Sequence, residues 1–190
     1  MTVTETALSG VLLIETRVFR DARGHFVEAY NEDRYRKAGL DVTFVQDNVS
    51  RSVGGVLRGL HAQNPCPQGK LVSVLDGEVF DVAVDARPGS PTFGQWVGYT
   101  LSADNGRQLY VPPGFLHGFV VTSESALFSY KCTDYYAPSA EVSVRWNDPD
   151  LGIAWPVAEP VLSDKDAAAP LLRDVPLDRL RMVEGREVAS

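Results

Sequence analysis

One of the three histidines in this chain, His61, lies in an apolar run that is typical of a β-strand. A neutral imidazole takes up a proton near its ordinary pKa of about 6.5, so His61 could be the general base of an enzyme. Such a base needs a carboxylate to orient its ring, and the segment "LSDKD" offers Asp164 and Asp166. Spacing along the chain neither chooses between these aspartates nor brings them to His61. A structural role for a lone histidine stays open.

Two further side chains could act in the same cavity. Lys70 begins the apolar run "KLVSVL", so it either lies at a strand end in solvent or points inward. Tyr130 alternates with Phe128 and Cys132 in "LFSYKC", which places all three on one strand face, the expected interior. An inward tyrosine is usually part of the core, and it can equally deliver a proton.

A metal site is the weaker interpretation of the histidines. It needs about three or four converging ligands, and a strand supplies two from one face at positions i and i+2. Two residues after His61 stands Gln63, so this pair is missing. His117 could be a third ligand, but His25 belongs to another predicted strand far away. We therefore predict no metal.

Four basic residues, Arg23, Arg58, Lys70 and Lys165, are candidates for binding a small phosphate-bearing ligand. The chain carries a net charge of −7, which argues against general nucleic-acid binding because that requires clustered Lys and Arg. Each cation taken alone is most often a solvated surface charge.

The elements that must position these residues are short runs rich in Val, Phe and Tyr, broken by Gly, Pro, Asn and Asp. This pattern predicts an all-β sandwich or barrel. The expected strands cover residues 11–19, 25–30, 43–48, 56–63, 69–85, 93–102, 107–112, 118–123 and 126–136. Within the fifth run, Asp76 and Gly77 predict a tight hairpin. Residues 31–38 predict a short helix ended by Gly39, and residues 160–172 a covering segment.

The length of 190 residues fits one domain, here residues 1–190, whose last fifteen or so form a charged peripheral tail. The N-terminal segment lacks the basic start and apolar core of a signal peptide, and no segment approaches a membrane span. Cys66 and Cys132 form no disulfide framework. We predict a cytoplasmic protein without membrane contact. Apolar residues on both strand faces favour a homodimer.

Several sequence blocks, in this order, resemble the dTDP-4-dehydrorhamnose 3,5-epimerase family, metal-independent members of the cupin superfamily. They are "RDARGHFVEAYN", "FVQDNVSRS", "GVLRGLHAQ", "QGKLVSVLDGEVFDVAVDARPGSPTFGQWVG", "PPGFLHGFVV", "YKCTDYYAP" and "RWNDPDLGIAWP". The resemblance covers residues 10 to 170. It implies a cupin-type jelly-roll β-barrel with short peripheral helices, and a homodimer with strand exchange.

The resemblance also implies the reaction and the residues that perform it. The substrate would be dTDP-4-keto-6-deoxy-D-glucose, inverted at C3 and C5 through an enolate without a cofactor, which agrees with the lack of a dinucleotide fingerprint. His61 would be the base, Asp166 its orienting partner, Tyr130 the acid and Lys70 the enolate stabiliser. The implied substrate-binding residues are Arg23, Phe26 and Glu28 from the other subunit, Gln46 and Asn48 at the nucleotide base, Arg58 at the diphosphate, and His117, Tyr136, Glu141 and Lys165.

Two positions depart from the family pattern beside these residues. Ala62 stands where family members often carry an aromatic residue, and Val49 where a histidine is common. They leave open a single-centre epimerase of a dTDP-4-keto-6-deoxyhexose, as occurs in antibiotic-sugar pathways. A non-catalytic sugar-nucleotide-binding cupin and a metal-dependent cupin enzyme are the remaining alternatives.

Overall fold

The computed structural model describes residues 1–181 and is built mostly of short strands. The strands are β1 (Thr2–Glu5), β2 (Leu12–Glu15), β3 (Val18–Asp21), β4 (Gly24–Val27), β5 (Gln46–Val53), β6 (Leu57–Gln63), β7 (Lys70–Asp76), β8 (Glu78–Asp85), β9 (Trp96–Ser102), β10 (Arg107–Val111), β11 (Phe115–Val121), β12 (Ser125–Cys132) and β13 (Glu141–Ser143). The helices are α1 (Glu32–Lys37), α2 (Asp164–Ala167) and α3 (Leu177–Leu180), with 3₁₀ turns at Pro138–Ala140 and Leu172–Asp174.

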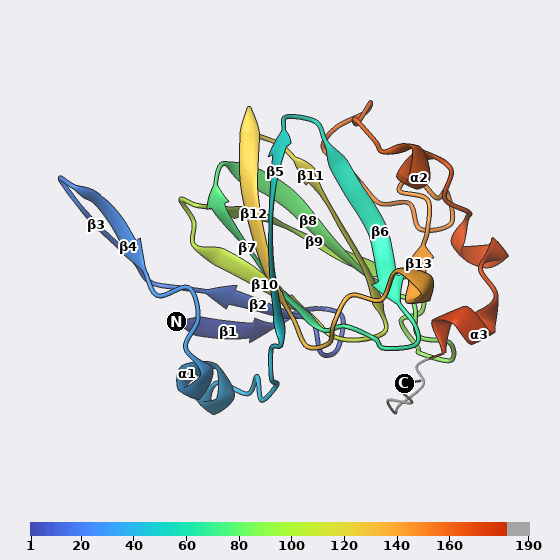
Figure 1. Ribbon diagram of the computed structural model, residues 1–190, viewed down its shortest axis with the longest axis horizontal. Coiled ribbons are helices and arrows are strands. Elements are labelled where there is room, and N and C mark those ends of the chain that lie inside the picture. Colours follow the sequence, from blue (N-terminus) through green and yellow to red (C-terminus); the bar gives the residue numbers. More distant parts are fainter. Residues whose placement is uncertain (182–190) are drawn as a thin grey trace.

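Two antiparallel sheets face each other (Figure 1). The first has the strand order β1-β2-β10-β7-β12-β5, and the second β13-β6-β11-β8-β9. Strands β3 and β4 form a separate hairpin that projects away from both sheets. The all-β prediction is confirmed. So is the helix expected at residues 31–38, where the Asn31 side chain accepts a hydrogen bond from the backbone N–H of Arg34 and caps α1.

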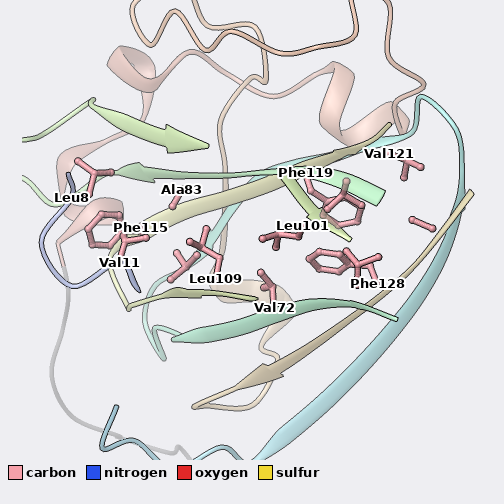
Figure 2. Packing of buried hydrophobic residues seen from close by; sticks show 14 residues of the cluster. Leu8, Val11, Val72, Ala83, Leu101, Leu109, Phe115, Phe119, Val121 and Phe128 are labelled. Carbon is pink, nitrogen blue, oxygen red and sulfur yellow. The ribbon is translucent and has the colours of Figure 1, made fainter. Parts of the chain in front are cut away.

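The main core lies between the two sheets (Figure 2). Alternate residues of β7, β10 and β12 point inward from one side, among them Val72, Leu109 and Phe128. Alternate residues of β8, β9 and β11 meet them from the other side, where the rings of Phe119 and Phe128 stack at 4.0 Å between centroids. Period-two patterning is therefore enough to specify this layer.

The five-stranded sheet is buried on its outer face as well. There Val82, Leu116 and Val142 pack against the chain after β13, including Leu172 and Leu180. Burial on both faces explains why β11 is a continuous apolar run, with every residue buried, rather than an alternating one. The covering segment predicted at residues 160–172 is thus confirmed. Residues 176–181 of the expected tail include α3, and the rest of the tail lies outside the described residues.

The predicted hairpin at Asp76 and Gly77 is wrong, although the turn is present. Strand β7 pairs with β10 and β12, whereas β8 pairs with β9 and β11, so the chain crosses from one sheet to the other at this turn. Gly77 has φ of +78°, and a Cβ there would overlap the carbonyl oxygen of Ser125. Turn residues indicate where the chain reverses, but not which strands then pair.

The strand expected at residues 11–19 is divided into β2 and β3, which belong to different sheets. Thr16, between them, bonds through both its backbone N–H and its hydroxyl to the carbonyl of Gly106, just beyond the last β2–β10 pair. Within residues 1–181, no helix is long and apolar enough to cross a membrane. Cys66 and Cys132 are free thiols.

Candidate active site

A cleft of about 560 Å³ opens between the two sheets. Strands β5, β7 and β12 form one wall, β6 and β11 the opposite wall, and residues 161–166 one side. The predicted site residues that line it are Arg58, His61, Lys70, His117, Tyr130, Tyr136, Lys165 and Asp166. An adjoining cleft of about 210 Å³ shares His61, Lys70, Tyr130 and Tyr136 and adds Gln46, Asn48 and Glu141.

His61 is hydrogen bonded to a carboxylate from a distant part of the chain. Its Nε2 lies 2.6 Å from Oδ1 of Asp166, whose side chain is only 4% exposed. Burial opposes ionisation of this carboxyl, but hydrogen bonds from His61, Ser163 and the Gly59 backbone outweigh burial and lower the pKa of Asp166. An ionised carboxylate only accepts, so Nε2 carries the hydrogen and Nδ1 is left with the lone pair that a base requires.

The covering segment brings Asp166 to His61. Val161 forms a parallel bridge with Val56, just before β6, and accepts a hydrogen bond of 3.0 Å from the backbone N–H of Leu57. Ser163 then caps α2 by accepting from the backbone N–H of Asp166. The short helix buries Asp166 and leaves Asp164, the other candidate, exposed.

Lys70 and Tyr130 face the cleft from the six-stranded sheet. Desolvation lowers the pKa of the Lys70 ammonium, and the nearby Cys132, Asp81 and Glu141 oppose this shift. Burial also raises the pKa of the Tyr130 phenol, so it remains protonated well above neutral pH. The site therefore holds a desolvated amine and a protonated hydroxyl together with an oriented imidazole.

A β-bulge places Arg58 and His61 in the same cleft. These residues are three apart, so regular alternation would point them to opposite faces of β6. In the structure His61 pairs with His117 and Arg58 with Phe119, with a shift in register between the two pairs. Gly59 lies in the shift with φ of +132°, and a Cβ there would come within 2.6 Å of the Cα of Gly118. Only glycine fits this close approach of β6 to β11.

Asp81 is a buried site residue that sequence reasoning missed. Its two carboxylate oxygens lie 3.0 and 2.9 Å from Nε2 of His117, and its side chain is fully buried. Burial raises the pKa of Asp81, and the contact with His117 opposes the rise. A charged residue within the apolar run "VFDVAVD" was the available signal.

Strand β5 lines the cleft with alternate polar side chains. Gln46 and Asn48, both predicted, are hydrogen bonded to each other, and Ser52 accepts from the Arg58 guanidinium at 3.1 and 3.2 Å. Between them lies Ser50, which the sequence analysis missed; its Oγ is buried and has no hydrogen-bond partner within residues 1–181. Its place in the alternation with Gln46 and Asn48 was the signal that could have found it.

Glu141 connects two other predicted residues at the edge of the site. Its carboxylate bonds to the ammonium of Lys165 and, at 3.1 Å, to the hydroxyl of Tyr136. Burial opposes ionisation of Glu141, but the contacts with Lys165 and Tyr136 outweigh it and lower the pKa of this carboxyl. The contact between Glu141 and Lys165 joins β13 to α2 beside His61.

Three predicted binding residues do not reach the cleft of their own chain. Arg23 and Phe26 lie on the β3–β4 hairpin, which projects from the sheets (Figure 1). Phe26 is 68% exposed. Arg23 bonds to Asp21 on the same hairpin, and Glu28 is paired with Arg34. These residues are outside both clefts of the chain that carries them.

No group of three or more His, Cys, Asp or Glu side chains in residues 1–181 is arranged to hold a metal ion. His61 and His117 are paired neighbours on β6 and β11. However, Nε2 of His61 is hydrogen bonded to Asp166, and Nε2 of His117 is hydrogen bonded to Asp81.

Comparison with known proteins identifies the family. The family model described as dTDP-4-dehydrorhamnose 3,5-epimerase matches residues 5–174. A Salmonella typhimurium protein of that name is 58% identical over 175 residues, which cover 90% of this chain and 96% of the relative. A Legionella pneumophila 3,5-epimerase, solved in complex with dTDP-4-keto-L-rhamnose, superposes with a TM-score of 0.92 at 53% identity, covering 97% of this chain and 99% of that one.

A protein named for a different epimerisation is also similar to this chain. A 3'-monoepimerase from Streptomyces bikiniensis, solved with dTDP-quinovose, has a TM-score of 0.83 at 38% identity and covers 88% of this chain and 86% of that one. These neighbours confirm the cupin-type jelly-roll expected from the sequence. The chain belongs to the dTDP-4-dehydrorhamnose 3,5-epimerase family.

Proposed function

We propose that the cleft epimerises dTDP-4-keto-6-deoxy-D-glucose at C3 and C5 to give dTDP-4-keto-L-rhamnose. The observation that carries the proposal is the His61–Asp166 pair, which faces the same cleft as Lys70 and Tyr130. The similar proteins, one of them solved with dTDP-4-keto-L-rhamnose, support the substrate class. A cytoplasmic location, expected from the sequence, stays a prediction.

The chemistry follows from the ketone at C4, which acidifies the protons on both neighbouring carbons. Nδ1 of His61 removes one of them, and the electron pair of the C–H bond forms an enolate with its charge on the ketone oxygen. The Lys70 ammonium, in its desolvated position, stabilises that oxygen. Tyr130 donates its phenolic proton to the opposite face of the carbon. Water then returns a proton to the phenolate and takes one from the imidazolium, which restores both side chains.

A single-centre epimerase is the second candidate, because the 3'-monoepimerase is similar to this chain. The two departures from the family pattern differ in their relation to the site. Val49 is 60% exposed and alternates with Asn48 and Ser50, so it points away from the cleft. Ala62 lines the adjoining cleft beside Gln63 and is therefore the departure that bears on substrate shape.

Incubating the purified protein with dTDP-4-keto-6-deoxy-D-glucose in deuterated water tests the proposal. We expect solvent deuterium at both C3 and C5 of the product, because each inverted carbon takes its new proton from a group that exchanges with solvent. NMR spectroscopy of the recovered sugar nucleotide locates the label. Deuterium at only one carbon would establish the single-centre reaction, and deuterium at neither would refute both candidates.

We also propose that the chain is a homodimer in which the β3–β4 hairpin completes the partner's site. The hairpin projects from the sheets (Figure 1), and the aromatic rings of Phe19 and Phe26 on it are exposed. The outer side of the six-stranded sheet exposes further apolar side chains, Val49, Val53 and Leu75. Exposed apolar surface on a sheet is commonly buried by association.

Two inactive variants should restore activity when they share a dimer. One carries His61→Asn, and the other Arg23→Ala with Phe26→Ala. In a heterodimer purified through two different tags, one site contains both defects and the other contains neither, so about half of the wild-type turnover per dimer is expected. If the hairpin served its own subunit, each site would carry one defect and turnover would stay at background. Light scattering reports the oligomeric state of every sample.

A further inference from the structure

We infer that Gln63 is a positioning residue that holds Tyr136 at the edge of the cleft, so that this tyrosine is in place before substrate binds. The inference rests on the proposed function for its kinetic consequence, and on the structure alone for its effect on the backbone around Tyr136. Gln63 follows His61 by two residues on β6, the position from which a second metal ligand would reach a site shared with His61.

The side-chain amide of Gln63 makes three hydrogen bonds and is only 6% exposed. Its Nε2 donates to the carbonyl oxygens of Cys66, at 2.6 Å, and Tyr135, at 3.0 Å. Its Oε1 accepts from the backbone N–H of Ala137 at 2.9 Å. Both amide protons are used within the protein, so Gln63 acts on the ligand site through the segment that it holds.

Two of these bonds lie on either side of Tyr136. The backbone N–H of Tyr136 itself donates to Oε1 of Gln46 at 2.9 Å. The two glutamines therefore hold both peptide units that flank Tyr136: the one before it through its carbonyl and its N–H, and the one after it through its N–H. The ring of Tyr136, which is 55% exposed, reaches Glu141 through its hydroxyl and lines both clefts.

Glutamine is suited to this position because one planar group both donates two hydrogen bonds and accepts another. A glutamate could still accept from Ala137, but it would face the carbonyls of Cys66 and Tyr135 with a second acceptor. A methionine of similar length could make none of the three bonds. Without them the segment around Tyr136 must be ordered when substrate binds, and that ordering weakens binding.

Gln63→Met should therefore raise KM by about 5- to 30-fold, the factor that corresponds to ordering the backbone of one residue, while kcat changes by less than about 2-fold. Tyr136→Ala should raise KM at least as much. The double variant should be no worse than Tyr136→Ala alone, because Gln63 then has no tyrosine to position. Additive effects in this cycle, or a fall in kcat equal to the fall in kcat/KM, would overturn the inference.

Hydrogen exchange of the unliganded protein separates this inference from the proposed function, because it needs no turnover. Gln63→Met should speed exchange of the amide protons of Tyr136 and Ala137 relative to the wild type. Gln108→Met is the matched control, since Gln108 is equally buried and its amide donates to the carbonyl of Ala29 at 2.8 Å, away from the cleft. The control should lower stability without changing KM or the exchange of these two amides. Unchanged exchange in Gln63→Met would refute the positioning role even in an active enzyme.

Discussion

His61→Asn should reduce turnover by about 10²- to 10⁴-fold, the contribution typical of a general base. Asparagine can still donate a hydrogen bond to Asp166, so the buried carboxylate keeps a partner, but it has no basic nitrogen. Exchange of the C3 and C5 protons with solvent should fall by the same factor, because both steps begin with proton removal. Turnover and deuterium incorporation are measured on the same samples by NMR spectroscopy.

The two aspartates of "LSDKD" provide a matched pair for this prediction. Asp166→Asn should also lower turnover strongly, because Nε2 of His61 loses the carboxylate that fixes its tautomer. Asp164→Asn changes an exposed carboxylate on the same short helix and should leave turnover within about 2-fold of wild type. If His61→Asn keeps solvent exchange at C3 and C5, His61 is not the base. Equal effects of the two aspartate variants would contradict the assignment of Asp166.

Tyr130→Phe should abolish net inversion while leaving part of the solvent exchange. The base and the enolate stabiliser, His61 and Lys70, both remain, so a proton can still be removed and returned from the same face. Without the phenol, no acid delivers a proton to the opposite face, and we expect inversion to fall by about 10²-fold or more. Comparing the rate of deuterium incorporation into recovered substrate with the rate of product formation measures the two steps separately.

Tyr99→Phe is the control for the loss of a hydroxyl, because Tyr99 is half-buried on β9 and packs against the main core. It should leave both rates unchanged. A parallel fall of exchange and inversion to background in Tyr130→Phe would show that Tyr130 does more than donate the final proton. Retained inversion would show that another group is the acid.

The sequence alone was sufficient to predict the elements whose side chains each point either into the core or away from it. Alternating runs predicted the strands that enclose the main core, because each side chain either points into the core or away from it. The fading of this alternation after Trp155 predicted the covering segment. The quoted sequence blocks also identified the family and the group of residues around the cleft, although the role of each residue stays a prediction.

Contacts between distant parts of the chain could not be predicted from local pattern. Spacing left Asp164 and Asp166 equivalent, and only the docking of residue 161 beside β6 and the turn of α2 buries Asp166 against His61. Asp81 gained its role only when β8 came to lie beside β11. Such pairings depend on how strands are ordered in a sheet, which the local pattern of one strand does not encode.

At the β6 wall of the cleft, too, the sequence determined one property and the tertiary structure another. The sequence determined that Arg58, His61 and Gln63 lie on one strand, whose composition favours burial. The tertiary structure decided which way they point, because the shift in register at Gly59 brings Arg58 and His61 to the same face. The physical reason is the close approach of Gly59 to Gly118 on β11, a contact between two strands more than fifty residues apart in sequence.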